Sequence, residues 1–234
     1  MADFDFDLTD PPKDEIVVET VVPLPESEFF TVGVAEDFGM LNWMKPYLKG
    51  IDGVIAGGAF KNVFGGEPVK DLDIFFESEE KWAKAVKKLR KRKWKEIYAN
   101  PRVIAFVHPK SGIRVELIGA ETDQEFGTNA VVYYSPEGTL ENFDFTVTKF
   151  LLGKAGDRFY VMYHPKFFEH LYLKRLSIDA EMVKPLSTFE RTLRYLGYGY
   201  KLCRDSKIKL VNAIGDEPME DEAQLSASFY DGVD

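Results

Sequence analysis

The chain has 234 residues, enough for one large domain with a full hydrophobic core, and its single cysteine, Cys203, excludes an intramolecular disulfide and a cysteine-rich zinc site. The first ten residues are acidic, and no apolar run reaches the length of a membrane span, so we expect neither a secretion signal nor a transmembrane helix. The composition therefore predicts a cytoplasmic protein with no membrane partner.

The net charge of −9 is distributed unevenly along the chain. Residues 1–28 hold nine acidic residues and one lysine, and residues 216–234 hold seven acidic residues and no basic one, which leaves a core at 29–215 with about +6. Both ends are predicted to be acidic tails too polar to pack, although IVVETVV at 16–22 is compatible with an edge strand. Such tails either solvate the protein or compete with an anionic substrate for the basic core.

The first half of the core alternates between helical and extended patterns. Apolar residues at helical spacing predict a helix over 35–48, and GVIAGG predicts a short strand that runs into two glycines. A short helix at 59–65 and a strand at 71–76 follow. Residues 78–92 give the clearest helix, because Ser78 is suited to cap it and two glutamates occupy its first turn.

The second half begins with strands and is then predicted to be mostly helical from about residue 143. The strands are expected at 94–99, 102–109, 113–120 and 129–135, and the clearest later helices at 169–178 and 187–202. This order predicts an α+β fold, in which a mixed β-sheet flanked by helices is followed by a small helical annex. We expect a sheet domain at 29–155 and helices at 156–215, with a boundary near residue 155.

Two aspartates interrupt the predicted strand DLDIFF. Because side chains alternate along a strand, Asp71 and Asp73 share one face, roughly 6–7 Å apart. Desolvated carboxylates need a partner, and a divalent cation is a natural one. Oxygen ligands favour Mg²⁺ or Mn²⁺ over zinc.

Glu116 repeats this pattern in IRVELIG, between two apolar residues. If its strand lies beside the first, Glu116 joins Asp71 and Asp73 in a three-carboxylate site of the kind that holds two metal ions for phosphoryl transfer. In the alternative, the aspartates lie at an exposed strand end and Glu116 pairs with Arg114 or a nearby lysine.

Gly57 and Gly58 stand between the first strand and its helix. Without Cβ atoms, they allow a sharp turn that brings backbone N–H groups and the helix N-terminus against a phosphate. A glycine pair is equally compatible with a simple tight turn.

Taken together, these motifs resemble the DNA polymerase beta–like nucleotidyltransferase superfamily, most closely the head domain of bacterial poly(A) polymerases and CCA-adding enzymes. GGAFKN resembles their GGxVRD, KDLDIFF resembles the segment with their metal-binding pair, and RVELIGAETDQEFGT resembles the segment with the third acid. ENFDFTVTKFLL and ERTLRY resemble their RRDFTINAL and RAxRF segments. The likeness covers about residues 51–200 in the same order.

The resemblance implies roles for individual residues. It implies that Asp71, Asp73 and Glu116 are the catalytic and metal-binding residues, with Mg²⁺ or Mn²⁺ as cofactor and a nucleoside triphosphate as substrate. The residues it implies for nucleotide binding are Gly57, Gly58, Lys61, Asn62, Asp144, Arg191 and Arg194.

The chain also departs from this family. Phe143 and Thr148 replace an arginine and an asparagine of the DFT segment, and no counterpart of the base-selecting EDxxR element precedes ERTLRY. The chain has no long helical region after the neck-like helices either. Strict alternation between CTP and ATP is therefore not expected.

Other chemistry-bearing residues have simpler explanations. Residues 81–97 carry nine Lys or Arg and, with Trp82, Trp94 and Tyr98, are suited to RNA contact, or they form a solvated helix face above core tryptophans. His164 and His170 are expected to be structural, because their spacing does not suit two ligands on one helix face.

Two functions remain in view. The first is a metal-dependent nucleotidyltransferase that adds a nucleotide to a hydroxyl, with an RNA or tRNA 3′ end as the favoured acceptor. The second is a nucleotide-binding or sensing module with little turnover that acts through a protein partner. Nothing in the residues indicates the oligomeric state.

Overall fold

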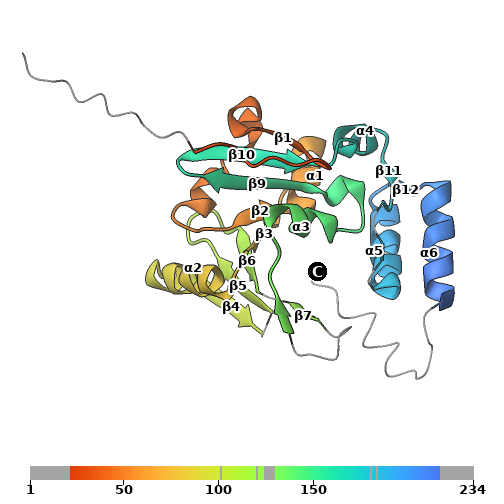
Figure 1. The fold of residues 1–234 in the computed structure, drawn as a ribbon. Coiled ribbons are helices and arrows are strands. Elements are labelled where there is room, and N and C mark those ends of the chain that lie inside the picture. Colours follow the sequence, from red (N-terminus) through yellow and green to blue (C-terminus); the bar gives the residue numbers. More distant parts are fainter. Residues whose placement is uncertain are drawn as a thin grey trace, which may run out of the picture.

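A computed structural model describes residues 22–100, 102–119, 121–123, 130–179, 181–182 and 184–216. Within these residues, eight strands form one mixed sheet in the order β1-β10-β9-β2-β3-β6-β5-β4 (Figure 1). The strands are β1 (Thr31–Val34), β2 (Val54–Ala56), β3 (Asp71–Phe75), β4 (Lys95–Ala99), β5 (Val103–Val107), β6 (Arg114–Ile118), β9 (Phe150–Ala155) and β10 (Arg158–Tyr163). β7 (Glu121–Asp123) and β8 (Ala130–Val132) form a separate antiparallel pair.

β3 and β6 are the central pair for function. They run parallel, with Asp71 beside Arg114 and Asp73 beside Glu116, whereas the other paired strands of this sheet are antiparallel. A parallel pair needs a long connection, and the chain supplies it through α2 (Glu79–Lys91), β4 and β5.

One face of the sheet carries the main hydrophobic core. Leu72 and Ile74 of β3 point into it and are fully buried together with Leu89 of α2. α2 begins at Ser78, whose hydroxyl accepts a hydrogen bond from the backbone N–H of Lys81, as the sequence predicts. α1 (Gly58–Gly65) contributes Phe60 to the same core.

The opposite face carries a smaller apolar cluster and the acidic residues of β3 and β6. α3 (Pro136–Glu141) lies against β2 and β9, and its Leu140 packs with Ala56 and Leu151. Phe75 and Phe143 extend this cluster towards the acidic residues. The two faces of β3 therefore differ sharply in chemistry.

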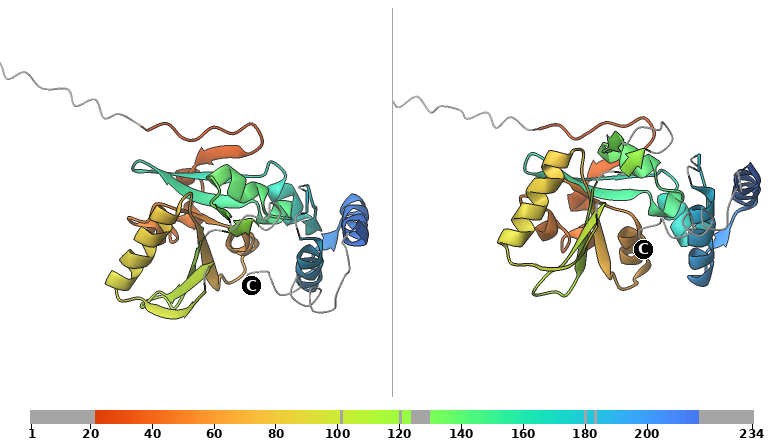
Figure 2. Two further views of the ribbon diagram at one scale, coloured as in Figure 1. Left: turned by 60° about the horizontal axis from the view of Figure 1, so that its bottom comes forward. Right: turned by 90° about the horizontal axis from the view of Figure 1, so that it is seen from below.

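The annex follows the sheet. It consists of α4 (Phe167–Tyr172), α5 (Pro185–Gly197), α6 (Arg204–Asp216) and a parallel pair of β11 (Arg175–Leu176) and β12 (Lys201–Leu202). α5 and α6 lie side by side at one end of the molecule, and α2 lies at the other (Figures 1 and 2).

Several expectations about secondary structure are wrong, beginning with the helix expected over 35–48. Residues 35–48 form three short 3₁₀ helices, η1 (Ala35–Asp37), η2 (Gly39–Leu41) and η3 (Lys45–Leu48), instead of one helix. Their apolar residues are buried as expected, but Gly39 disfavours continuous helix and Pro46 lacks the N–H that it needs.

The expectation of mostly helical structure after residue 143 is wrong for β9 and β10. These strands form a hairpin that turns at Gly156, where φ is +59°. The sheet therefore runs through residue 155 to Tyr163. The periodicity of a short apolar run does not distinguish a buried strand from a buried helix. Here the segment forms strands because β10 pairs with β1 and β9 pairs with β2.

The helices expected at 169–178 and 187–202 are too long, because α4 ends at Tyr172 before β11 and α5 ends at Gly197 before β12, with positive φ at Lys174 and Gly199 in the two connections. The overall arrangement agrees with the predicted α+β fold, a mixed sheet with flanking helices. Of the strand predicted at 16–22, residues 16–21 lie outside the residues that the structure describes. Within the described chain, no helix combines the length and the apolar character needed to cross a membrane.

Candidate active site

A row of side chains crosses six neighbouring strands on the α3 side of the sheet. Strand register places Asp73 of β3 directly beside Glu116 of β6, and the residues next to this pair on β2 and β5 are both alanines. The full row is Leu151, Ala56, Asp73, Glu116, Ala105 and Tyr98. Because alanines flank the two acids, no bulky neighbour in the row covers them.

Asp71 lies on the same face of β3 as Asp73, so the structure brings together the three acids that the sequence singles out. We call Asp71, Asp73 and Glu116 the carboxylate cluster. They differ in exposure, since the side chain of Glu116 is fully buried while that of Asp71 is 34% exposed. Asp73 is partly buried.

Arg114 is the basic member of this site. It lies two residues before Glu116 and opposite Asp71, so its side chain is on the same face. Its Nη2 donates to Oδ2 of Asp71 at 2.6 Å, and its Nε lies 2.9 Å from Oε1 of Glu116. The pairing of Glu116 with Arg114, which the sequence left as an alternative, therefore coexists with the cluster.

One guanidinium does not compensate three carboxylates. Burial, together with the nearby Glu116 and Asp71 carboxylates, raises the pKa of Asp73 to about 8, although Arg114 opposes this shift. Burial and a hydrogen bond to Glu116 also raise the pKa of Tyr98 to about 12. The cluster therefore holds excess negative charge at a partly enclosed position.

Gly57 joins the glycine turn to this cluster. Its φ of +95° disfavours any residue with a Cβ, and a Cβ built there would lie 3.3 Å from the Phe143 ring and 3.7 Å from Oδ2 of Asp73. Gly57 is also the N-cap of α1, and no side chain caps that helix end. The N-terminal amides of α1 thus lie beside the carboxylates and are suited to phosphate.

Lys61 and Asn62 are engaged within the protein. The Lys61 ammonium lies 3.4 Å from Glu67 and 5.0 Å from the centre of the Tyr198 ring, and burial lowers its pKa. Asn62 accepts a hydrogen bond from Lys61 and donates to the carbonyl of Pro68. These two residues brace α1 against its following loop and against α5.

Asp144 and Arg191 contact each other. Arg191 Nε donates to Oδ2 of Asp144 at 2.6 Å, and Thr188 donates to Oδ1 at 2.9 Å. Arg194 lies on the exposed side of α5. Of the predicted nucleotide-binding residues, Gly57 and Gly58 therefore lie at the turn beside the cluster, whereas Lys61, Asn62, Asp144 and Arg191 contact other residues of the protein.

Sequence reasoning gave no role in the site to two neighbours of the cluster. Phe143, which replaces an arginine of the resembled family, packs against Phe75 and approaches Gly57. Tyr98 was considered only for RNA stacking, yet it contacts Glu116. The spacing of Arg114 and Glu116 was a usable signal, whereas the approach of Phe143 and Tyr98 depends on non-local packing.

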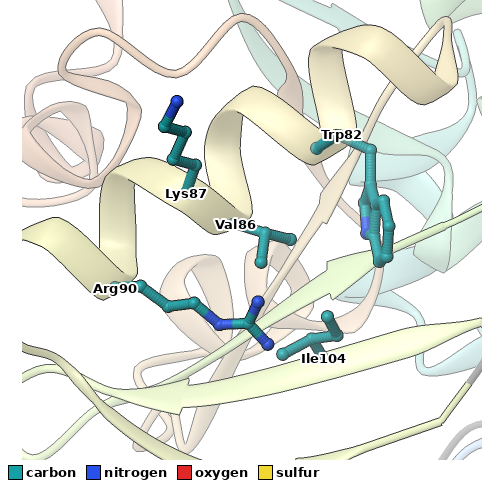
Figure 3. A pocket seen from close by; sticks show the side chains of 6 residues that line it. Trp82, Val86, Lys87, Arg90 and Ile104 are labelled. Atoms are coloured by element: carbon teal, nitrogen blue, oxygen red, sulfur yellow. The ribbon is translucent and has the colours of Figure 1, made fainter.

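A pocket between α2 and β5 lies on the other face of the sheet (Figure 3). Trp82, Lys87, Arg90 and Ile104 contribute to its lining. Ile104 pairs in register with Leu117, whose side chain points away from the Glu116 face. Because Trp82 Nε1 donates to the carbonyl of Leu117, this tryptophan anchors α2 on the sheet and the pocket is remote from the carboxylates.

The donor set fits Mg²⁺ or Mn²⁺ in its chemistry. Its ligands are all carboxylate oxygens, and burial together with the Glu116 and Asp71 carboxylates raises the pKa of Asp73, a penalty on the charged form that a bound cation would offset. Over the described residues, however, no three His, Cys, Asp or Glu side chains are already arranged as a metal site.

Comparison with known proteins adds a family and a fold. The model of a family described as "Gabija anti-defense 2 family protein" matches residues 34–174. No curated relative matches the chain significantly.

Solved structures of tRNA-processing enzymes share the fold. A complex of CCA-adding enzyme with ATP has a TM-score of 0.55 at 15% identity, over 86% of this chain and 51% of that chain. A complex of CCA-adding enzyme with CTP has 0.55 at 13% identity, over 81% and 47%. A tRNA nucleotidyltransferase with primer tRNA and an incoming ATP analogue has 0.52 at 17% identity, over 74% and 49%. The chain thus spans about half the length of these proteins, and the likeness establishes a nucleotidyltransferase-like fold.

Proposed function

The chain belongs to the Gabija anti-defense 2 family, and from this premise we propose that it is a metal-dependent nucleotidyltransferase that serves an anti-defence role. It transfers a nucleoside monophosphate from a nucleoside triphosphate to a hydroxyl acceptor, with an RNA 3′ end as the favoured acceptor. The observation that carries the proposal is the carboxylate cluster on adjacent strands beside the Gly57 turn.

In this proposal the carboxylate cluster holds Mg²⁺ or Mn²⁺, which when bound would neutralise the triphosphate and favour in-line attack. The N-terminal amides of α1, which begin beside Asp73, bind phosphate oxygens. Fully buried Glu116 keeps its carboxylate orientation through Arg114 and Tyr98.

The proposed transfer needs only the nucleoside triphosphate and the acceptor hydroxyl as reactants. The acceptor hydroxyl oxygen forms a bond to the α-phosphorus, and the bond from that phosphorus to the bridging oxygen breaks. Pyrophosphate leaves with the electron pair, and the hydroxyl proton passes to a carboxylate of the cluster, for which we propose Glu116.

The neighbouring folds support an RNA acceptor only by analogy. The titles of the matched structures name tRNA, CTP and ATP for those proteins. The present chain covers about half of their length, so the experiment treats RNA and protein acceptors as separate outcomes.

The test incubates the full chain with Mg²⁺, each α-labelled nucleoside triphosphate and total tRNA. Asp71→Asn and Asp73→Asn are the inactive variants, and Asp157→Asn in the β9–β10 turn is the control for loss of one exposed acid. Label on RNA that requires Asp71 and Asp73 supports the proposal. Label on the protein supports transfer to a protein hydroxyl.

A second function, nucleotide binding without turnover, is supported by Phe143 beside Gly57 and by the Arg114 contacts inside the cluster. It predicts that equilibrium dialysis detects bound nucleoside triphosphate while no acceptor receives label. Transfer dependent on Asp73 contradicts this second function.

A further inference from the structure

Arg114 occupies an unusual position for a basic residue near carboxylates that bind cations. Its guanidinium bridges two of the three acids, at 2.6 Å from Asp71 and 2.9 Å from Glu116. A guanidinium fork matches carboxylate geometry and gives charge-assisted hydrogen bonds. Two of the three acids are therefore already bound to a cation supplied by the chain.

The contact between Arg114 and Asp71 lies at the protein surface and not deep in the core. The Arg114 side chain is 37% exposed and that of Asp71 is 34% exposed, while Glu116 is fully buried. The guanidinium thus has a route towards solvent that does not require the sheet to open. Glu116 has no such route, because it is fixed within the row between Asp73 and Ala105.

The third acid shows that the compensation is incomplete. Arg114 contacts Asp71 and Glu116, whereas no ion-pair or hydrogen-bond partner is found for Asp73 in the described part of the chain. A divalent cation placed among the three acids supplies more charge than one guanidinium. With Arg114 alone, the cluster therefore keeps uncompensated negative charge.

We propose that Arg114 is a displaceable internal counter-ion, which occupies part of the cation site in the metal-free protein and leaves Asp71 and Glu116 when a divalent cation binds. The inference rests on the proposed function, because it takes the carboxylate cluster as the cation ligands. It adds that Arg114 lowers cation affinity. A basic residue remote from the cluster would change cation affinity little, because solvent and salt screen its charge.

The test measures binding of Mn²⁺ alone to the full chain, by the loss of the free-ion signal in electron paramagnetic resonance. Arg114→Gln removes the charge but keeps a hydrogen-bond donor, and Arg114→Ala removes both. We expect each to bind Mn²⁺ about 10- to 100-fold more tightly than the unaltered chain, the factor that corresponds to about one hydrogen bond to a charged group.

Arg90→Ala is the matched control. Arg90 pairs with Glu96 on the α2 side, so its loss changes the net charge equally without touching the cluster. Mn²⁺ affinity should stay within about twofold in this variant. The double variant Arg114→Gln/Asp73→Asn should lose the gain in Mn²⁺ affinity. That loss would assign the bound ion to the carboxylate cluster.

A thermal unfolding series separates this effect from misfolding. Without metal, Arg114→Gln should unfold at a lower temperature, because Glu116 loses its cation, and Mn²⁺ should raise its unfolding temperature more than that of the unaltered chain. Equal or weaker Mn²⁺ binding by both Arg114 variants overturns the inference but leaves the proposed function standing if Asp73-dependent transfer is seen. Absence of Mn²⁺ binding in every variant overturns both.

Discussion

At the residue scale, Gly57 and Gly58 are adjacent, but they differ in how well each position would tolerate a side chain. Gly57 has a φ of +95° and a Cβ there would approach the Phe143 ring, whereas one at Gly58 would meet only the Tyr195 hydroxyl, at 3.7 Å. Gly57→Ala should therefore lower the free energy of unfolding by about 1–3 kcal/mol. Gly58→Ala should change it by less than about 1 kcal/mol. Urea denaturation measures both, and equal losses would contradict this assignment of strain to Gly57.

Asp73 gives a prediction about pH. Its pKa in the folded protein, about 8, exceeds the ordinary value of 3.8, so the folded chain binds the additional proton between these values. The stabilisation from that proton is fully present below pH about 4 and is lost as pH rises through about 8. In EDTA, Asp73→Asn should thus gain stability relative to the unaltered chain as pH rises from 5 towards 8.

The control for this prediction is Asp157→Asn, an exposed acid in the β9–β10 turn. Its stability relative to the unaltered chain should show little change over the same pH interval. If the stability difference between Asp73→Asn and the unaltered chain did not change with pH, Asp73 would not be an uncompensated carboxylate.

At the scale of elements, Asp179 connects the segment after β11 to the open end of the β9–β10 hairpin, where Lys149 precedes β9 and His164 follows β10. It contacts Lys149 at 2.9 Å and His164 at 3.0 Å, and Lys149 is almost fully buried. Burial would raise the pKa of Asp179, but hydrogen bonds from His164 and Lys149 outweigh it and hold the pKa at about 2. The stability from these contacts is therefore present above pH about 4 and lost as pH falls towards 2.

Asp179→Asn should cost about 2–3 kcal/mol of unfolding free energy at neutral pH, because it leaves buried Lys149 without its carboxylate. The value lies at the low end for a broken buried pair, since the Asp179 side chain is 33% exposed. Guanidinium titration at pH 7 and pH 3 measures the loss, which should be smaller at pH 3. A loss that does not depend on pH would point to packing instead of charge.

At the scale of the whole molecule, Asp144 and Arg191 connect the sheet domain to α5. The contact is 2.6 Å long and the Asp144 side chain is only 13% exposed. A double-mutant cycle with Asp144→Asn and Arg191→Gln should give a coupling energy of about 1–3 kcal/mol in unfolding, without nucleotide present. Additive effects would contradict a stabilising interaction between these two residues.

The sequence alone determined much of this protein's local structure. The capping serine and the apolar spacing of α2, the glycine turn before α1, and the alternation that places Asp71 and Asp73 on one face all depend on residues close together in the chain. Such features follow from backbone sterics and side-chain periodicity.

Only the tertiary structure decided which segments meet. β6 pairs with β3 in a register that places Glu116 beside Asp73, and a shift of one residue would have turned Glu116 to the opposite face. The same pairing brings Arg114 between Asp71 and Glu116, and the β9–β10 hairpin joins the sheet through its contacts with β1 and β2. These outcomes depend on hydrogen bonding and packing between distant segments, which local spacing does not specify.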